Sequence, residues 1–264
     1  MSVGWWHRLQ TVRAQTARRS ECSCPQPVRA MPTTLSPATA NRILSRVSAE
    51  DFALLAPHLK QIDLPLRKQL ETRNKRIEHV YFPESGFASV VANGTGHSIE
   101  VGLIGREGMT GLAIVMGADR TPHDTFIQGQ GAGLRISAEK LRQALAKGRT
   151  LQRSCLLFAH AFGLQTTYTA IANGRSKIEE RLARWLLMAR DRVDTDDLTL
   201  THEFLSLMLG VRRPGVTGAM HLLVTRGLIK AHRGIISIVD RNGLEKTSNG
   251  AYGVPEAEFQ RLFG

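Results

Sequence analysis

The spacing of the apolar residues changes twice along this chain, and each change predicts a change of architecture. Between residues 61 and 136 the apolar runs are short and are separated by glycine and proline, and residues 99–104 alternate in polarity. Alternation predicts half-buried strands, and the Asn93-Gly94 pair between two runs predicts a hairpin because both residues tolerate a positive φ. Several short strands joined by turns imply a compact β-roll or barrel.

Helical spacing lies on both sides of this region. Before it, residues 37–60 carry a helical pattern with Ser48 as the expected N-cap, followed by the acidic residues Glu50 and Asp51. After it, Ser137 is the expected N-cap of another helix, and a long helix follows at about 150–173. We expect Asn173-Gly174 to end this long helix before a further helix opens a second domain.

The long helix has two apolar stripes. The first steps by four and three residues: Leu151, Cys155, Phe158, Phe162, Gln165, Thr169 and Ala172. The second is formed by Leu157, Ala161, Leu164, Tyr168 and Ile171. A helix that is apolar on two faces must bury both. We expect one face to pack on the β-roll. We expect the other, the first stripe with Phe158 and Phe162, to pair with a second copy of the chain. A core helix of a single chain is the alternative.

Residues 199–224 predict two short helices joined by a tight turn. Thr201 can cap the first helix, Gly210 supplies the turn, and the second helix begins near Arg213 with Pro214 in its first turn. The inner face of the second helix would carry apolar residues at positions 216, 220 and 223. This is the pattern of a helix-turn-helix unit. Behind it, apolar residues flank His232-Arg233-Gly234, which predicts a wing with a basic tip.

The charges of this module favour nucleic acid. Five cations (Arg212, Arg213, Arg226, Lys230 and Arg233) face a single acid, Glu203, between residues 198 and 236, and the whole chain has a formal net charge of +12. Arginine at the start of a recognition helix can bind guanine O6 and N7, and neighbouring cations can neutralise phosphates. Taken singly, each arginine could be only a solvated surface charge.

With these features together, the chain resembles the Crp/Fnr family of bacterial transcription regulators over about residues 45–245. The resemblance is most specific at 176–192 (SKIEERLARWLLMARDR) and 200–217 (LTHEFLSLMLGVRRPGVT). It implies a cytoplasmic homodimer that binds a palindromic operator in double-stranded DNA and contacts RNA polymerase, and it places Arg213 at the family's base-contacting arginine. The expected DNA-binding residues are Thr201, Arg212, Arg213, Pro214, Thr217 and Arg233.

This recognition segment departs from the family pattern. The family pattern of Ser-Arg-Glu and a later Arg is replaced by Arg212, Arg213, Pro214 and Gly218. The operator sequence should therefore differ from the usual one.

The resemblance also suggests where an effector would bind. Members that bind cyclic nucleotides use a phosphate cassette, which here corresponds to residues 105–109 through 119–123. Arg120 could bind the phosphate, but Pro122 lacks an N–H group and Asp119 would repel the anion. Thr166 and Thr167 fall where the central helix of the family offers hydroxyls to the base of the ligand. The candidate effector pocket comprises Arg106, Glu107, Arg120, Thr166 and Thr167. We expect it to bind an unknown small effector rather than cyclic AMP. The competing function is a cyclic-nucleotide or small-molecule sensor that acts through protein contacts.

No cofactor, metal site or enzymatic activity is expected. The three cysteines, Cys22, Cys24 and Cys155, lack the spacing of an iron–sulfur site, and Cys155 fits better as a small buried residue. Haem ligation by a single histidine (His79, His97 or His123) stays an alternative. No metalloprotease motif, Walker loop or nucleophile elbow occurs. The uncharged segment 154–174 is too polar for a lipid-facing helix, so no membrane partner is expected.

These observations predict an α+β chain with five parts. They are a disordered basic tail (1–36), a β-roll sensor domain (37–149), a central dimerisation helix (150–174), a winged helix-turn-helix domain (175–245) and a C-terminal tail (246–264). Two alternatives remain for the basic N-terminal tail. Its arginine-rich, acid-poor composition also fits an organelle transit peptide, or the tail is upstream sequence and translation starts at Met31.

Overall fold

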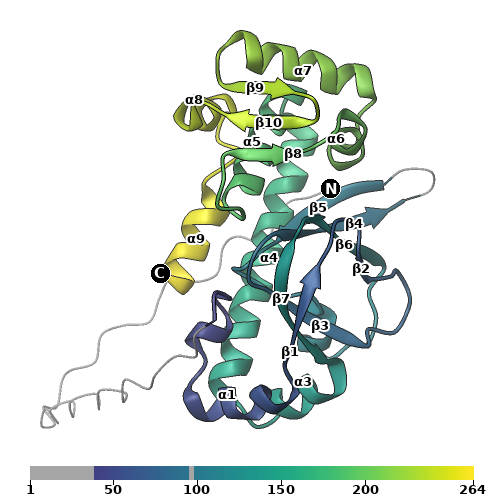
Figure 1. The fold of residues 1–264 in the computed structure, drawn as a ribbon, viewed down its shortest axis with the longest axis vertical. Coiled ribbons are helices and arrows are strands. Elements are labelled where there is room, and N and C mark those ends of the chain that lie inside the picture. Colours follow the sequence, from purple (N-terminus) through teal and green to yellow (C-terminus); the bar gives the residue numbers. More distant parts are fainter. Residues whose placement is uncertain (1–38, 95–97) are drawn as a thin grey trace, which may run out of the picture. The chain divides into compact units, whose positions relative to one another are not determined.

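The computed structural model describes residues 39–94 and 98–264. The predictions for the basic tail, Met31, Cys22, Cys24 and His97 therefore lie outside the described residues. The described part is mixed helix and strand, with a β-sheet domain, a long helix and a helix-turn-helix domain in that order (Figure 1). This confirms the predicted fold class.

Two antiparallel sheets form the N-terminal part. One has the strand order β1-β7-β3 and the other β2-β6-β4-β5. Their bounds are β1 Lys60–Leu64, β2 Gln69–Glu71, β3 His79–Pro83, β4 Phe87–Asn93, β5 Ser98–Ile104, β6 His123–Gly129 and β7 Gly131–Ser137. Strands β4 and β5 pair as the Asn93-Gly94 signal predicts, with Asn93 opposite Ser98.

Short helices pack around these sheets. They are η1 Leu44–Arg46, α1 Ala49–Leu55, η2 Ala56–His58, α2 Leu112–Val115 and α3 Ala138–Leu145. Both predicted caps are present, because Ser48 accepts a hydrogen bond from the Asp51 N–H and Ser137 accepts one from the Lys140 N–H. The apolar faces of α1 and α3 share one core with the sheets and with the first half of the long helix.

The long helix α4 spans Arg149–Arg175, and its first stripe packs inside its own chain. Leu151, Cys155 and Phe158 are buried in the sensor core, and Gln165 exchanges hydrogen bonds of 2.6 and 3.2 Å with the backbone of Leu103 in β5. The prediction that this stripe pairs two copies of the chain is therefore wrong. The helix ends one residue beyond the expected Asn173-Gly174, at Arg175, where the extended Ser176 donates its N–H to the Ala172 carbonyl before α5 begins.

The outward side of α4 has a different composition. Leu156 and Ile171 are 46% and 47% exposed, and small side chains lie between them. A Cβ atom added at Gly163 or Gly174 would meet no atom of this chain within 4 Å. We call Leu156, Gly163, Thr167, Ala170, Ile171 and Gly174 the outer face of α4. No helix in the described ranges is both long and apolar enough to cross a membrane.

The C-terminal part has a three-stranded sheet in the order β8-β10-β9, and its core is continuous with Phe87, Val91 and Leu103 of the sensor sheet. Its elements are α5 Ile178–Arg190, β8 Asp197–Thr199, α6 His202–Leu209, α7 Arg213–Thr225, β9 Ile229–His232, β10 Ile235–Ile238 and α8 Arg241–Thr247. Helix α5 is buried along most of its length and joins this core to β5, where the Trp185 Nε1–H donates to Glu100 at 2.6 Å.

The segment 246–264 is not a tail. It contains the helix α9, Val254–Phe263, which returns from the C-terminal part and lies along α4 (Figure 1). Phe263 is buried in the sensor core and stacks on Phe259 with ring centroids 4.6 Å apart. The carbonyl of Gly264 accepts a hydrogen bond from Arg46 at 3.1 Å. The apolar positions of α9 find their partners at the start of the sensor domain, which explains why a local pattern did not predict this packing.

Candidate nucleic-acid interface

Helices α6 and α7 form the predicted helix-turn-helix. Thr201 caps α6 by accepting a hydrogen bond of 3.2 Å from the Phe204 N–H. Gly210 ends α6 at a φ of 61°, a left-handed conformation that glycine adopts without the steric cost of a side chain. The inner face of α7 is buried as predicted, with Val216, Met220 and Leu223 in the core. Local capping and one glycine thus set the angle at which α7 leaves the turn.

The opposite face of α7 is exposed. It carries Arg213 and Pro214 in the first turn, and then Thr217 and His221. The Thr217 hydroxyl donates to the Arg213 carbonyl at 3.1 Å and lies 3.1 Å from His202 Nδ1. Arg212 is the N-cap residue of α7, and its side chain makes no capping hydrogen bond. Both guanidinium groups therefore stand at the exposed start of the helix.

The wing is a tight hairpin between β9 and β10. His232 pairs with Ile235, so Arg233 and Gly234 alone form the turn, with φ values of 47° and 81°. Positive φ at both turn residues is the type I′ geometry that glycine and asparagine prefer. Arginine at this position costs backbone energy, and such strain is most often found where a side chain has a function.

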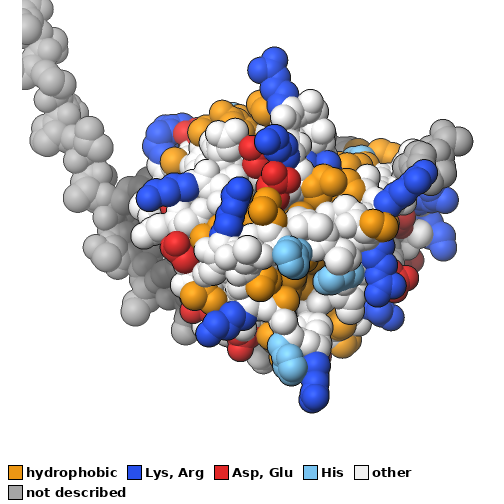
Figure 2. Space-filling model, turned by 90° about the horizontal axis from the view of Figure 1, so that it is seen from above, with side chains coloured by type: hydrophobic (Ala, Val, Ile, Leu, Met, Phe, Trp, Pro, Cys, Tyr) orange, Lys and Arg blue, Asp and Glu red, His pale blue; other side chains and the backbone are white. Residues whose placement is uncertain are grey.

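The start of α7 and the wing border the same hollow. Residues from α6, α7, β9 and β10 and from the segments that connect them line it, among them Thr201, His202, Arg213, His232 and Arg233. From the end that carries α7 and the wing, Lys and Arg side chains project around this face, with histidines between them (Figure 2). The structure therefore gathers Thr201, Arg213 and Arg233 on one surface. Arg212 borders a different hollow, between α6 and the β4–β5 hairpin.

Sequence reasoning named His232 only as part of the wing tip and missed His202 and His221 on this surface. His202 contacts Thr217, His232 lines the hollow, and His221 lies on the exposed face of α7. Thr217 and His221 are four residues apart, so they lie on the same face of the helix, opposite its buried face. This spacing predicts that His221 is exposed beside Thr217. The proximity of His202 to Thr217 depends on the angle between two helices, which no local pattern contains.

Comparison with known proteins agrees with this geometry. Residues 180–247 match the model of the Crp-like helix-turn-helix domain. Similar solved structures include the FixK2 protein of Bradyrhizobium japonicum, with a TM-score of 0.62 at 15% identity over 72% of this chain and 96% of that one. The chain has the Crp/Fnr fold and carries a Crp-like helix-turn-helix domain. The predicted resemblance is confirmed at the level of fold and domain.

Two further Crp/Fnr-type structures extend the comparison. A CRP-family transcriptional regulator of Thermus thermophilus gives a TM-score of 0.60 at 15% identity over 74% of this chain and 98% of that one. The global regulator CLP of Xanthomonas campestris, described as responsive to c-di-GMP, gives a TM-score of 0.58 at 17% identity over 72% of this chain and 99% of that one. The comparison with curated proteins found no match.

The five candidate effector residues do not form one pocket. Arg106 and Glu107 line a cavity of about 260 Å³ beside α4 and α9. Arg120 does not line it and instead pairs with its neighbour Asp119 at 3.0 Å. The hydroxyls of Thr166 and Thr167 donate to carbonyls of their own helix, at 3.1 and 2.9 Å. The grouping of Arg120, Thr166 and Thr167 with Arg106 is therefore corrected.

One N–H group of the segment 105–123 already has a carboxylate acceptor. Glu71 of β2 accepts hydrogen bonds from the Gly111 N–H and the Thr125 hydroxyl. Burial raises the pKa of Glu71 above its ordinary value, although these two hydrogen bonds act in the opposite direction. The Gly111 N–H is therefore already paired inside the chain.

Cys155 is the one cysteine within the described residues, and it is fully buried. Burial raises the pKa of its thiol to about 12, so the thiol stays protonated at neutral pH. This agrees with the interpretation of Cys155 as a small apolar core residue.

Proposed function

We propose that this protein is a sequence-specific DNA-binding transcription regulator that binds a palindromic operator as a homodimer in the cytoplasm. The observation that supports it best is the surface that Arg213 and Arg233 share: a recognition helix and a basic wing on either side of one hollow. No enzymatic activity is part of this proposal.

DNA binding follows from the chemistry of that surface. Arg213 begins α7, where a guanidinium can reach the edge of a guanine in the major groove. Arg233 stands at the wing tip, from which it can bind phosphate. Exposed Lys230 and Arg226 add cations that attract the DNA backbone.

The homodimer would form through the outer face of α4. Its two exposed large apolar side chains, Leu156 and Ile171, are separated by Gly163, Thr167 and Ala170, which are small enough for close approach of a second helix. The exposed His160 lies 3.6 Å from Glu258 of α9. Two recognition helices in one dimer would enter successive major grooves, about 34 Å apart. Operator symmetry then reflects the symmetry of the protein, and RNA polymerase is the expected partner at the promoter.

Selection of genomic DNA fragments with the purified full-length protein tests this function. We expect recovery of fragments that share an inverted repeat and that bind with at least a thousandfold preference over random DNA at 150 mM salt. Binding without sequence preference, or only to RNA, would contradict the proposal.

A further inference from the structure

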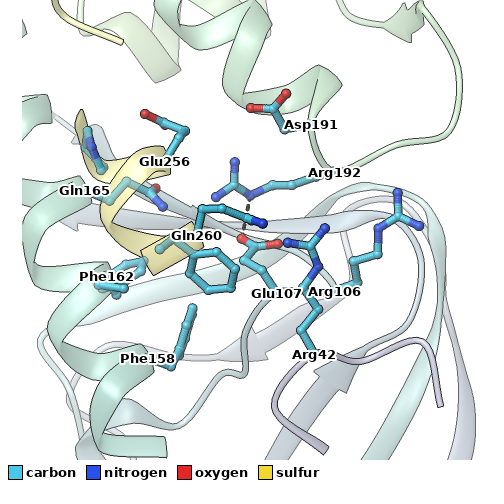
Figure 3. A pocket seen from close by; sticks show the side chains of 13 residues that line it. Arg42, Arg106, Glu107, Phe158, Phe162, Gln165, Asp191, Arg192, Glu256 and Gln260 are labelled. Atoms are coloured by element: carbon cyan, nitrogen blue, oxygen red, sulfur yellow. Dashed lines mark hydrogen bonds and ion pairs between the residues drawn. The ribbon is translucent and has the colours of Figure 1, made fainter. Parts of the chain in front are cut away.

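One cavity joins the sensor domain, the long helix and the end of the chain. Its lining comes from the segments around Arg42 and Arg106, from α4, from the end of α5 and from α9 (Figure 3). Its volume is about 260 Å³, and it lies apart from Arg120 in the cassette region. Since α9 follows the winged domain in the chain, this cavity has one wall from the sensor domain and another from the segment attached to the DNA-binding domain.

Most charged groups around the cavity already have partners. Arg192 pairs with Glu107 at 2.7 Å, and both side chains are largely buried. Arg106 pairs with Asp194 at 2.6 Å, and Asp191 pairs with Arg241 at 2.9 Å. Glu256 accepts the Gly253 N–H at 2.8 Å and so caps α9. These contacts consume the carboxylates that could attract a cationic ligand.

Arg42 is the exception. Its guanidinium lies over the Phe259 ring at 5.8 Å, and within the described part of the chain no carboxylate pairs with it. The Gln260 side-chain amide, on the next position of α9, likewise makes no hydrogen bond to another described residue. The cavity therefore offers one cation and one neutral polar group to an incoming molecule.

The other side of the cavity is aromatic. Phe158 and Phe162 of α4 line it with their rings 6.2 Å apart, and Phe259 of α9 lines the facing wall. Phe162 and Phe259 are only partly buried, so each has ring surface left to cover. Aromatic rings bury large apolar areas against one another, and binding cavities for small molecules combine such surfaces with a few placed polar groups.

We propose that this cavity binds a small aromatic monocarboxylate, with its ring between Phe162 and Phe259 and its carboxylate on Arg42. This inference rests on the proposed function, because it makes the bound acid the effector of the regulator. A polyanion such as a nucleotide fits poorly, since Glu107, Asp191 and Glu256 line the same cavity and Arg42 is its one cation without a carboxylate partner among the described residues. The ligand connects Arg42 of the sensor domain to α9, and so it stabilises the docked position of α9.

Calorimetric titration of the full-length protein, without DNA, tests the site. The probes are benzoate, phenylacetate and indole-3-acetate. Two matched compounds serve as controls: benzamide, which lacks the charge, and cyclohexanecarboxylate, which lacks the aromatic ring. We expect one of the three acids to bind once per chain, and its matched compounds to bind at least tenfold more weakly. Absence of binding by all three acids, or equal binding of benzamide, would overturn the inference.

Three variants locate the binding. Arg42→Gln should lower the affinity for the acid at least tenfold. Arg42→Lys should keep part of the affinity because it keeps the charge. Arg120→Gln is the control, because it removes an exposed arginine from the cassette region and leaves the cavity intact. Loss of binding in Arg120→Gln with no loss in Arg42→Gln would place the ligand at Arg120, outside this cavity.

The link to regulation is measured separately. The bound acid should change the affinity for the selected DNA fragments, and the DNA should change the affinity for the acid by the same factor. If the acid binds but leaves DNA affinity unchanged, its role as effector is wrong although the site stands. If selective DNA binding is absent while the acid binds, the proposed function fails and the site does not.

Discussion

At the scale of single residues, we expect Arg213 and Arg233 to have different tasks on DNA. Arg213 opens α7 and is exposed, whereas Arg233 occupies the two-residue turn of the wing. Replacing Arg213 by Ala should cost about 1–3 kcal/mol of binding and relax the preference at one base pair in each half-site. A binding-site selection on the variant measures this. If the preference is unchanged, another residue of the α7 surface reads that base.

Arg233 requires a different substitution because its φ is 47°. In an Arg233→Ala variant the backbone would stay strained, so the effect of the strain could not be separated from the effect of the lost charge. Asparagine tolerates this conformation. Arg233→Asn should weaken binding to all sequences alike and reduce the salt slope by about one unit per subunit. A salt titration of DNA affinity measures the slope, and a change in base preference would contradict a phosphate contact.

Residue patterns predicted the contacts that depend on near neighbours. Thr201, Ser48 and Ser137 cap their helices through hydrogen bonds three residues along, and Gly210 makes its turn with its own backbone. The pairing of Glu71 with Gly111 joins residues forty positions apart, on β2 and in the turn before α2. No local signal in the sequence distinguishes that pairing from a solvated glutamate.

At the scale of elements, α4 shows why an apolar stripe alone does not assign a helix face. Both stripes have helical spacing, but the contacts of Gln165 with Leu103 in β5 turn the first one toward the sheet. Gly108 agrees with this orientation, since a Cβ there would lie 2.0 Å from the Phe158 ring. The face left for a second copy is therefore the outer face of α4.

The outer face gives a direct test of the homodimer. Leu156→Glu combined with Ile171→Glu should produce monomers and abolish operator binding, because charged side chains would be buried at the helix contact. Sedimentation measures the mass. Leu66→Glu is the matched control, since Leu66 is 50% exposed in the sensor domain, and it should leave the dimer intact. A dimeric double variant would place the interface elsewhere.

Helix α9 gives a second test at this scale. Phe263 is 4% exposed in the sensor core, so Phe263→Ala should weaken the docking of α9 by about 3 kcal/mol. We expect faster amide exchange in residues 254–263 while the buried strands of the sensor domain keep their protection. Leu262→Ala, at a partly buried neighbour, should have a smaller effect. Unchanged exchange in the Phe263 variant would show that other contacts hold α9.

At the scale of the whole molecule, Glu100 couples the sensor domain to the DNA-binding domain. It lies in β5, and its carboxylate accepts the Trp185 indole N–H from α5. Its second oxygen has no partner among the described atoms. Burial raises the pKa of Glu100 to about 7, against the opposing effects of the nearby Ser89 hydroxyl, of the hydrogen bond from Trp185 and of the charges on Arg184 and Arg192.

This pKa predicts a loss of stability with rising pH. Between pH 4.5 and 7 the unfolded chain releases the Glu100 proton while the folded chain keeps it, so the free energy of unfolding falls by about 3 kcal/mol and then levels off. Glu100→Gln should remove this part of the pH dependence and keep an acceptor for Trp185. Urea unfolding of both proteins from pH 5 to 8 gives the difference, and parallel curves would contradict the assignment.

The burial of Phe263 in the sensor core also has a consequence for how the protein is made. Synthesis proceeds from the N-terminus, so the whole winged domain leaves the ribosome before this side chain does. Until then the sensor domain lacks one wall, and its apolar surface beside η1 and α4 is open to chaperones. A chain cut short within the winged domain would lack α9, and the apolar surface that Phe263 covers in the full-length protein would stay exposed.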